Sequence, residues 1–236
     1  MNNDLKAETI SNYPAIKISS GSMEAVKWLA LLAMTIDHAN RFLYEGALYT
    51  AYSIGRLAMP LFAFIFAYNL ARPNSLASGI YPKVLKRLVL FGLPAIPFYI
   101  AMRHLQHVYP LNIMFTLAAA AFVLFLYESQ HRSDLIYAIL VFLLSGFFVE
   151  YNWQGIMLCI SAWFFCRKPS AISLLACLAS FILLDDLNGN HWAMAAIPII
   201  YLATKIDFEI PRIPYFFYFY YPLHLSFLYF LSKLIY

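Results

Sequence analysis

Residues 35–41 read Thr35-Ile36-Asp37-His38-Ala39-Asn40-Arg41, inside an otherwise apolar stretch that covers about residues 24–44. An acid, an imidazole and a guanidinium are costly in hydrocarbon, about 3 kcal/mol for Asp or Arg at the middle of a helix on insertion scales. A membrane-spanning helix tolerates such groups where they face a protein interior or a wet cavity, and there they usually serve a function. The stretch therefore predicts a membrane helix that carries ionisable chemistry.

The composition places this stretch in a polytopic α-helical membrane protein. Of the 236 residues, 63% are hydrophobic and 12% are charged, whereas a soluble domain carries about 25% charged residues. Several apolar runs reach the roughly 20 residues that cross a bilayer. The net charge of +4 arises from basic residues scattered among loops, so no nucleic-acid-binding surface is expected. We expect a polar cytoplasmic N-terminal tail, residues 1–22, followed by a single transmembrane domain, residues 23–236.

Nine apolar segments follow one another along the chain and predict an all-α membrane helix bundle. They cover about residues 24–44, 48–70, 84–102, 111–127, 134–149, 152–166, 170–184, 191–204 and 213–233. Ser22 is the expected N-cap of the first segment, because a Ser hydroxyl there accepts a hydrogen bond from the first helical turn. With the N-terminus in the cytoplasm, most Lys and Arg residues fall in inner loops, as the positive-inside rule requires. The sequence therefore predicts about nine transmembrane helices, with the N-terminus cytoplasmic.

Polar groups from four of these segments are expected at one depth, between the membrane midplane and the outer face. With a rise of about 1.5 Å per residue, His38 lies well across the first segment toward the outside, and Arg56 enters the second segment from the outside. Asn112 and Thr116 open the fourth segment from the same side, and His224 lies near the middle of the last one. This convergence predicts a site within the membrane.

Each charged group in the first two segments also has a purely structural interpretation. Asp37 and Arg41 are four residues apart, so they share a helix face and can neutralise each other. His38 points about 100° away around the helix and can be an ordinary hydrogen-bonded core residue. Arg56 can pair with Asp37 or with a bound anion. Intramembrane charges more often mark a functional site, and we favour that interpretation for Asp37, His38 and Arg41. For Arg56 the structural and the functional interpretation stay equally open.

The last segment carries the second candidate imidazole. Its aromatic run, residues 215–221, is typical of an interfacial belt. His224 follows a proline that removes one hydrogen bond from the helix ladder, and we expect it to line the site together with Tyr221. His104 and His107 are spaced like metal ligands, but no Cys or carboxylate lies near them in sequence. Solvated loop histidines are therefore favoured there, and no metal is expected.

Six motifs carry a family resemblance. In chain order they are KWLALLAMTIDH (27–38), GRLAMPLFAF (55–64), YPKVLKRL (81–88), PFY (97–99), NIMFTL (112–117) and YPLHL (221–225). This order resembles the TraX family of conjugative-transfer membrane proteins, from about residue 24 onward and most weakly over residues 128–210. The resemblance implies acetylation of the N-terminus of an F-type pilin subunit, with acetyl-CoA as donor, in the bacterial inner membrane. The bundle also looks like the wider group of integral-membrane acyltransferases, a likeness of architecture only.

With that activity implied, the catalytic set is expected to be His38, Asp37, Arg56 and His224. His38 is the expected general base for the amine that attacks the thioester, and Arg56 or Asn112 is expected to stabilise the oxyanion. Asp37 would hold an arginine in place, and His224 would connect the donor channel to His38. A route through an acetyl-histidine intermediate is equally compatible with the sequence.

Two further groups of residues are assigned to binding. The expected substrate contacts are Arg41, Asn112, Thr116 and Tyr221. The inner basic cluster is expected to hold the phosphates of CoA, or alternatively to set the topology and contact anionic lipid. Its members are Arg72, Lys83, Lys86 and Arg87.

Two other functions stay open at this point. A small-molecule transporter or permease also places charges, prolines and broken helices at the midplane, although no inverted repeat is visible between the halves of the chain. A structural component of pilus assembly is the other alternative. It predicts that changes at His38 and Arg56 act only by destabilising the protein.

Overall fold

Helices follow one another through nearly all of the computed structural model, which describes residues 16–236. They are α2 (Ser20–Leu43), α3 (Tyr49–Gly55), α4 (Ala58–Leu70), α5 (Ile80–Arg103), α6 (Ile113–Ser129), α7 (Arg132–Ser145), α8 (Asn152–Arg167), α9 (Ala171–Asn188), the 3-10 helix η1 (Trp192–Ala195), α10 (Ala196–Ala203) and α11 (Phe216–Ile235). No strand occurs within the described residues. The prediction of an all-α fold is confirmed.

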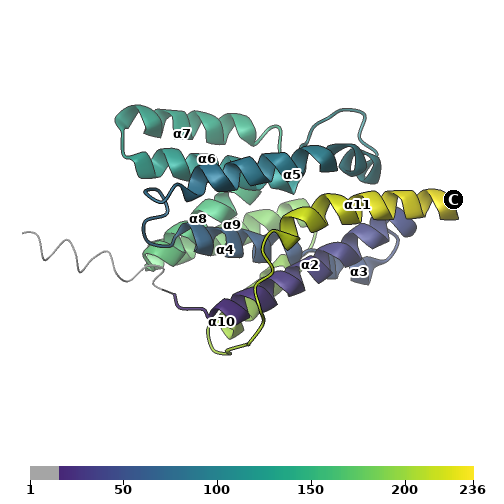
Figure 1. Ribbon diagram of the computed structural model, residues 1–236, viewed down its shortest axis with the longest axis horizontal. Helices are drawn as coiled ribbons and strands as arrows, with labels where there is room; N and C mark the ends of the chain where they lie inside the picture. Colours follow the sequence, from purple (N-terminus) through teal and green to yellow (C-terminus); the bar gives the residue numbers. More distant parts are fainter. Residues whose placement is uncertain (1–15) are drawn as a thin grey trace, which may run out of the picture.

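Each apolar segment of the sequence contains a helix, and two of the segments are divided. The second segment breaks into α3 and α4, and the eighth into η1 and α10. Figure 1 shows α2, α5 and α11 side by side, and α11 packs against both of the others. α4 lies at the centre of the bundle, where Leu61, Ala63 and Ala67 are fully enclosed. Two alanines one turn apart let neighbouring helices approach closely, as is usual in membrane bundles.

Three helical stretches of residues 16–236 are long and apolar enough to cross a membrane. They are Tyr49–Leu70, Ile80–Arg103 and Ala171–Asn188. α2 has the length but carries charged side chains, among them Asp37 and Arg41, that are turned into the bundle. Large apolar side chains also cover the outside of the bundle, for example on α7 and α9. Such a surface is typical of a protein that faces lipid, so the chain has the features of a membrane protein.

The first described helix begins earlier than the sequence indicated. Its N-cap is Ser19, whose side chain accepts a hydrogen bond from the Ser22 backbone N–H. The prediction of Ser22 as N-cap is therefore wrong. The Ser22 hydroxyl instead donates to the Ile206 carbonyl at 2.5 Å and accepts from the Phe208 N–H at 3.2 Å, which ties the segment before α11 to the start of α2. Residues 1–15 of the expected tail lie outside the described residues.

The break between α3 and α4 places Arg56 against α2. Gly55 ends α3, and a Cβ atom at this position would collide with the side chain of Asp37. Only glycine permits this approach of the two helices, since any larger residue would push them apart. The backbone N–H groups of Arg56 and Leu57 form tight bonds to the carbonyls of residues 53 and 54, at 3.1 Å each. The turn therefore places the Arg56 side chain next to the Asp37 carboxylate.

Candidate functional site

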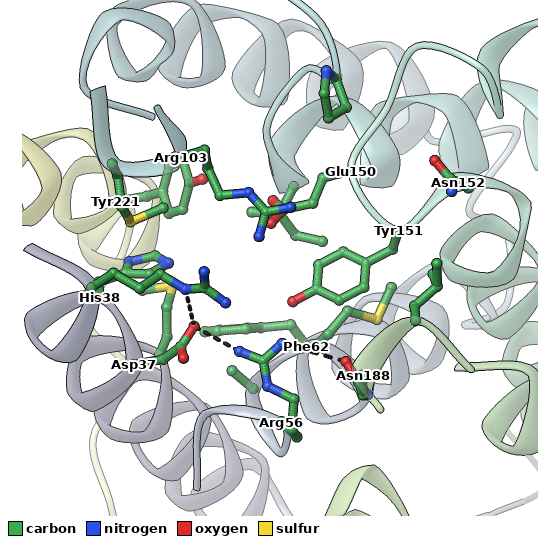
Figure 2. Close-up of a pocket in the computed structure, with 18 residues that line it drawn as sticks. Asp37, His38, Arg56, Phe62, Arg103, Glu150, Tyr151, Asn152, Asn188 and Tyr221 are labelled. Carbon is green, nitrogen blue, oxygen red and sulfur yellow. Dashed lines mark hydrogen bonds and ion pairs between the residues drawn. The ribbon is translucent and has the colours of Figure 1, made fainter. Parts of the chain in front are cut away.

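A cavity of about 240 Å³ lies between the C-terminal half of α2, the α3–α4 break, the end of α5 and the end of α9 (Figure 2). Its lining is rich in ionisable and aromatic side chains. The apolar part of the wall consists of Met34, Ala58, Met59, Phe62, Met102, Pro110, Ile113 and Leu187. Five of the residues that the sequence singled out line this cavity, namely Asp37, His38, Arg41, Arg56 and Tyr221. The predicted convergence of α2, α3–α4 and α11 on one space therefore appears in the structure.

The buried carboxylate of Asp37 holds two guanidinium groups. Its Oδ2 accepts from Nη2 of Arg56 at 2.7 Å and from Nε of Arg41 at 3.2 Å. Arg56 is enclosed on its other sides as well: Nε donates to the Tyr52 carbonyl, Nη1 donates to Asn188 at 3.4 Å, and the guanidinium lies 4.2 Å from the centre of the Tyr52 ring. Both structural pairings that the sequence left open for Asp37 are therefore present together.

His38 has a different partner, on α11. Its Nδ1 lies 2.7 Å from Nε2 of His224, and the other ring nitrogen of His224 lies 2.8 Å from the Tyr220 carbonyl. His224 is buried and does not line the cavity itself, so it reaches the cavity only through His38. Neighbouring residues on a helix diverge, which is why Asp37 pairs with the arginines and leaves His38 to the last helix.

The opposite wall of the cavity was not identified from the sequence. It consists of Arg103, Glu150, Tyr151, Asn152 and Asn188, and Figure 2 shows Arg103 reaching toward Glu150. Glu150 lies in the loop before α8, and burial raises its pKa despite the nearby guanidinium of Arg103. A lone acid in a short turn resembles an ordinary loop residue. Only its position between two apolar segments and beside two polar residues gave any signal.

The backbone of this wall is unusual at two successive positions. Tyr151 and Asn152 have φ values of 64° and 47°, a region that L-residues other than Asn and Asp seldom adopt. For Tyr151 such a conformation costs about 1–3 kcal/mol, whereas an asparagine adopts it more readily. The two residues lie at the start of α8, and this turn places both side chains on the cavity.

Asn112 and Thr116 do not line the cavity, and the structure shows what each does instead. Both are fully buried. The Asn112 side chain caps α6 through the Met114 N–H at 3.1 Å and donates to the Gly92 carbonyl at 3.0 Å. The Thr116 hydroxyl donates to the Glu150 carbonyl. Thr116 therefore holds the loop that carries Glu150, whereas Asn112 caps α6 and joins it to α5.

The basic cluster lies at the other end of α5 from the cavity. Lys83 and Lys86 are exposed, and Arg87 is partly buried, with its guanidinium 3.1 Å from the Tyr215 hydroxyl and 4.7 Å from the centre of that ring. Arg87 precedes Arg103 on the same helix by a span that corresponds to about 24 Å at 1.5 Å per residue. The structure therefore does not bring the cluster and the cavity into one site.

The charges of the cavity determine what it can do. Three guanidiniums, on Arg41, Arg56 and Arg103, face two carboxylates, on Asp37 and Glu150. Each guanidinium has five N–H donors, and the hydrogen bonds that Arg41 and Arg56 make to Asp37, Tyr52 and Asn188 use only a few of them. The cavity can therefore bind an oxygen that carries or develops negative charge, beside an imidazole that can accept a proton.

Fold and site together define an α-helical membrane protein with a buried ionisable cavity. The chain matches the family described as TraX protein over residues 22–232. It therefore belongs to the TraX family, as its motifs indicated. The match includes residues 128–210, where the motif resemblance was weakest.

One curated relative shares a shorter region. The chain is 38% identical over 69 residues to a protein of Rickettsia prowazekii (strain Madrid E) that is described as "Uncharacterized protein RP591". This region is 29% of the present chain and 23% of the relative. No solved structure matches the chain.

Proposed function

We propose that this protein is an integral-membrane acetyltransferase that moves the acetyl group of acetyl-CoA to the N-terminal amine of a pilin subunit, in the inner membrane of a bacterium. Membership of the TraX family supports the pilin as acceptor. The observation that carries the chemistry is the His38 imidazole, which lies on a cavity walled by three arginines and is held from behind by His224. Such a site has a proton acceptor and stabilising donors for an acyl transfer.

In this proposal the reaction begins at the amine of the acceptor. A free α-amino group has a pKa of about 7.7–8.0 and attacks only when it is not protonated. His38 takes the proton as the amine nitrogen bonds to the thioester carbonyl carbon. The C–S bond then breaks, the amide forms, and the CoA thiolate takes the proton back from His38. Acetyl-CoA supplies the acyl group, and no redox partner is required.

The arginines supply the second part of the catalysis. Attack on the thioester places negative charge on the carbonyl oxygen, and donors that are fixed beforehand stabilise that charge most effectively. Arg56 is fixed by Asp37, by Asn188 and by the Tyr52 ring, and Arg41 shares the same carboxylate. We assign the oxyanion to these two guanidiniums. We do not assign the oxyanion to Asn112, because Asn112 does not line the cavity and its amide bonds to the Gly92 carbonyl.

The proposed topology brings the two substrates together. About nine spans with the N-terminus in the cytoplasm place the cavity toward the outer face, where a processed pilin presents its new N-terminus. The cluster of Arg72, Lys83, Lys86 and Arg87 then lies on the cytoplasmic side, where acetyl-CoA is available. If the cluster holds the CoA phosphates, the pantetheine arm must run along α5 toward the cavity. Its role as a topology determinant requires no such path.

The test is the intact mass of an F-type pilin that is co-expressed with the protein. Replacing His38→Ala should abolish the gain of one acetyl group while the variant still accumulates in the membrane. His107→Ala is the matched control, because His107 is exposed in the loop after α5 and should leave acetylation intact. Complete acetylation by the His38→Ala variant would refute the proposed role of this imidazole. Solute flux into proteoliposomes without acetyl transfer would favour a transporter.

A further inference from the structure

The hydrogen bonds of the two histidines determine where their protons lie. The Tyr220 carbonyl oxygen only accepts, so His224 Nδ1, at 2.8 Å from it, carries the hydrogen. A neutral imidazole has a single N–H, so Nε2 of His224 is an acceptor. His38 Nδ1, at 2.7 Å from that Nε2, must then donate. The hydrogen positions follow from this bonding network, because for neutral rings each step allows only one assignment.

The ring geometry agrees with a hydrogen bond of this kind. The planes of His38 and His224 differ by 7° and their centroids are 5.0 Å apart, well beyond the 2.7 Å between the two nitrogens. The nitrogens therefore lie between the centroids, and the rings meet edge to edge in one plane. That is the plane in which the lone pair of an imidazole nitrogen points, so the N–H of His38 is directed at it.

The remaining nitrogen of His38 is available to the cavity. Nε2 has no hydrogen-bond partner among residues 16–236, and it is not one of the fully enclosed polar atoms that lack a partner. His38 also contributes to the cavity lining. With the proton on Nδ1, this nitrogen carries a lone pair, which is the form that a general base or a nucleophile needs.

α2 and α11 are joined at a second point one turn away. The Thr35 hydroxyl donates to the Leu31 carbonyl at 2.8 Å, so the Tyr220 hydroxyl, 2.8 Å from Thr35, must donate to it. The Tyr220 ring lies 4.8 Å from the His224 ring at 11°. These contacts fix the register of the two helices, and with it the position of His224 opposite His38.

We propose that His224 is a positioning residue that holds His38 in the Nδ1–H tautomer and directs its basic Nε2 into the cavity. The inference rests on the proposed function only for what His38 does with that lone pair. During acyl transfer the proton of the amine moves to Nε2 and later leaves to the thiolate, while the Nδ1–H bond to His224 stays in place. A neutral imidazole orients His38 without adding a further charge to the five ionisable arginine and carboxylate groups that already line the cavity.

The tautomer can be measured without any assay of activity. Protein labelled with ¹⁵N-histidine, in detergent, is examined by ¹H–¹⁵N correlation through the two-bond couplings of the rings, and the His38 signals are assigned by comparison with His38→Gln. We expect the wild-type His38 to carry its proton on Nδ1. His224→Gln places an amide oxygen near the former Nε2 and should keep this form. His224→Leu removes the acceptor and should shift His38 to the Nε2–H form.

Kinetics with acetyl-CoA and a peptide of the pilin N-terminus provide the second readout. His224→Leu should lower kcat about 100-fold with little change in KM, in the range of a lost general base, and His224→Gln should recover most of the loss. An Nε2–H tautomer in the wild type, or an unchanged Nδ1–H tautomer in His224→Leu, would overturn the inference. If His224→Leu does not fold, the wild-type and His224→Gln spectra still decide. Absence of acetyl transfer by the wild type would refute the proposed function and leave the tautomer result valid.

Discussion

The two ends of the bundle use the same residue types in opposite ways. At the cavity end, Arg56 is buried, bonded to Asp37 at 2.7 Å and stacked on an aromatic ring. At the other end, Arg72, Lys83 and Lys86 are exposed, and the structure pairs none of these three with a carboxylate among residues 16–236. A buried charge is tolerated only with a partner, whereas an exposed charge contributes little to stability. Substitutions at the two ends should therefore differ in kind.

The largest effect is expected at Asp37. Asp37→Ala leaves Arg56 and Arg41 without their shared carboxylate in a largely enclosed place, and breaking a buried ion pair in this way costs about 3–5 kcal/mol. We expect a marked loss of thermal stability in detergent. The measurement is the fraction of protein that stays monodisperse after heating. Lys83→Ala is the control at the exposed end and should change the transition within the scatter of replicates.

The pair can be tested further by removing both charges. Asp37→Asn with Arg56→Gln removes the more deeply buried of the two uncompensated guanidiniums and leaves only that of Arg41, so it should recover part of the stability that Asp37→Ala loses. Acetyl transfer should stay low in the double variant, because one of the two proposed oxyanion donors, Arg56, is gone and the other, Arg41, has lost the carboxylate that fixes it. Equal stability of Asp37→Ala and wild type would show that Asp37 is not holding these guanidiniums in the membrane-embedded protein.

An intermediate effect is expected where α2 and α11 are joined. Tyr220→Phe removes the hydroxyl that donates to Thr35 but keeps both the ring beside His224 and the backbone carbonyl that fixes its tautomer. One such hydrogen bond contributes about 1 kcal/mol. A double-mutant cycle with Thr35→Val, read from thermal unfolding, should give a coupling of that order. A coupling of zero would mean that these hydroxyls do not bond.

Sequence reasoning located the fold and one wall of the site because both depend on local patterns. Apolar segment length marks a helix, and an acid, an imidazole and an arginine inside such a segment mark its functional face, so Asp37, His38, Arg41 and Arg56 were found. Glu150 was not found, because it reaches the cavity through a pairing of distant backbone: Glu150 N–H donates to the Leu111 carbonyl at 2.7 Å. No local spacing encodes such a contact.

The same distinction explains the residues whose surroundings differ from expectation. Asn112 and Thr116 are polar residues at the start of an apolar segment, which suits a binding site and a structural support equally well. Which of the two holds depends on the partners that folding supplies, here Gly92 and the Glu150 loop. Depth along a helix is predictable from residue count, but the direction of a side chain depends on how neighbouring helices pack.

The smallest effect on stability is expected at the basic cluster, which makes it the sharpest test of what that end of the bundle does. Lys83→Gln with Lys86→Gln changes only exposed side chains, so the free energy of unfolding should stay within about 0.5 kcal/mol of wild type. If the cluster holds the CoA phosphates, the KM for acetyl-CoA should rise several-fold, and more at low salt, where charge interactions are less screened. The kcat should not change, because these lysines lie far from His38.

The alternative outcome is an unchanged KM together with a mixed orientation of the variant in the membrane, measured by cysteine accessibility. That outcome would assign the cluster to topology. The contrast between the two ends would then distinguish charged residues that take part in catalysis from charged residues that set the membrane topology.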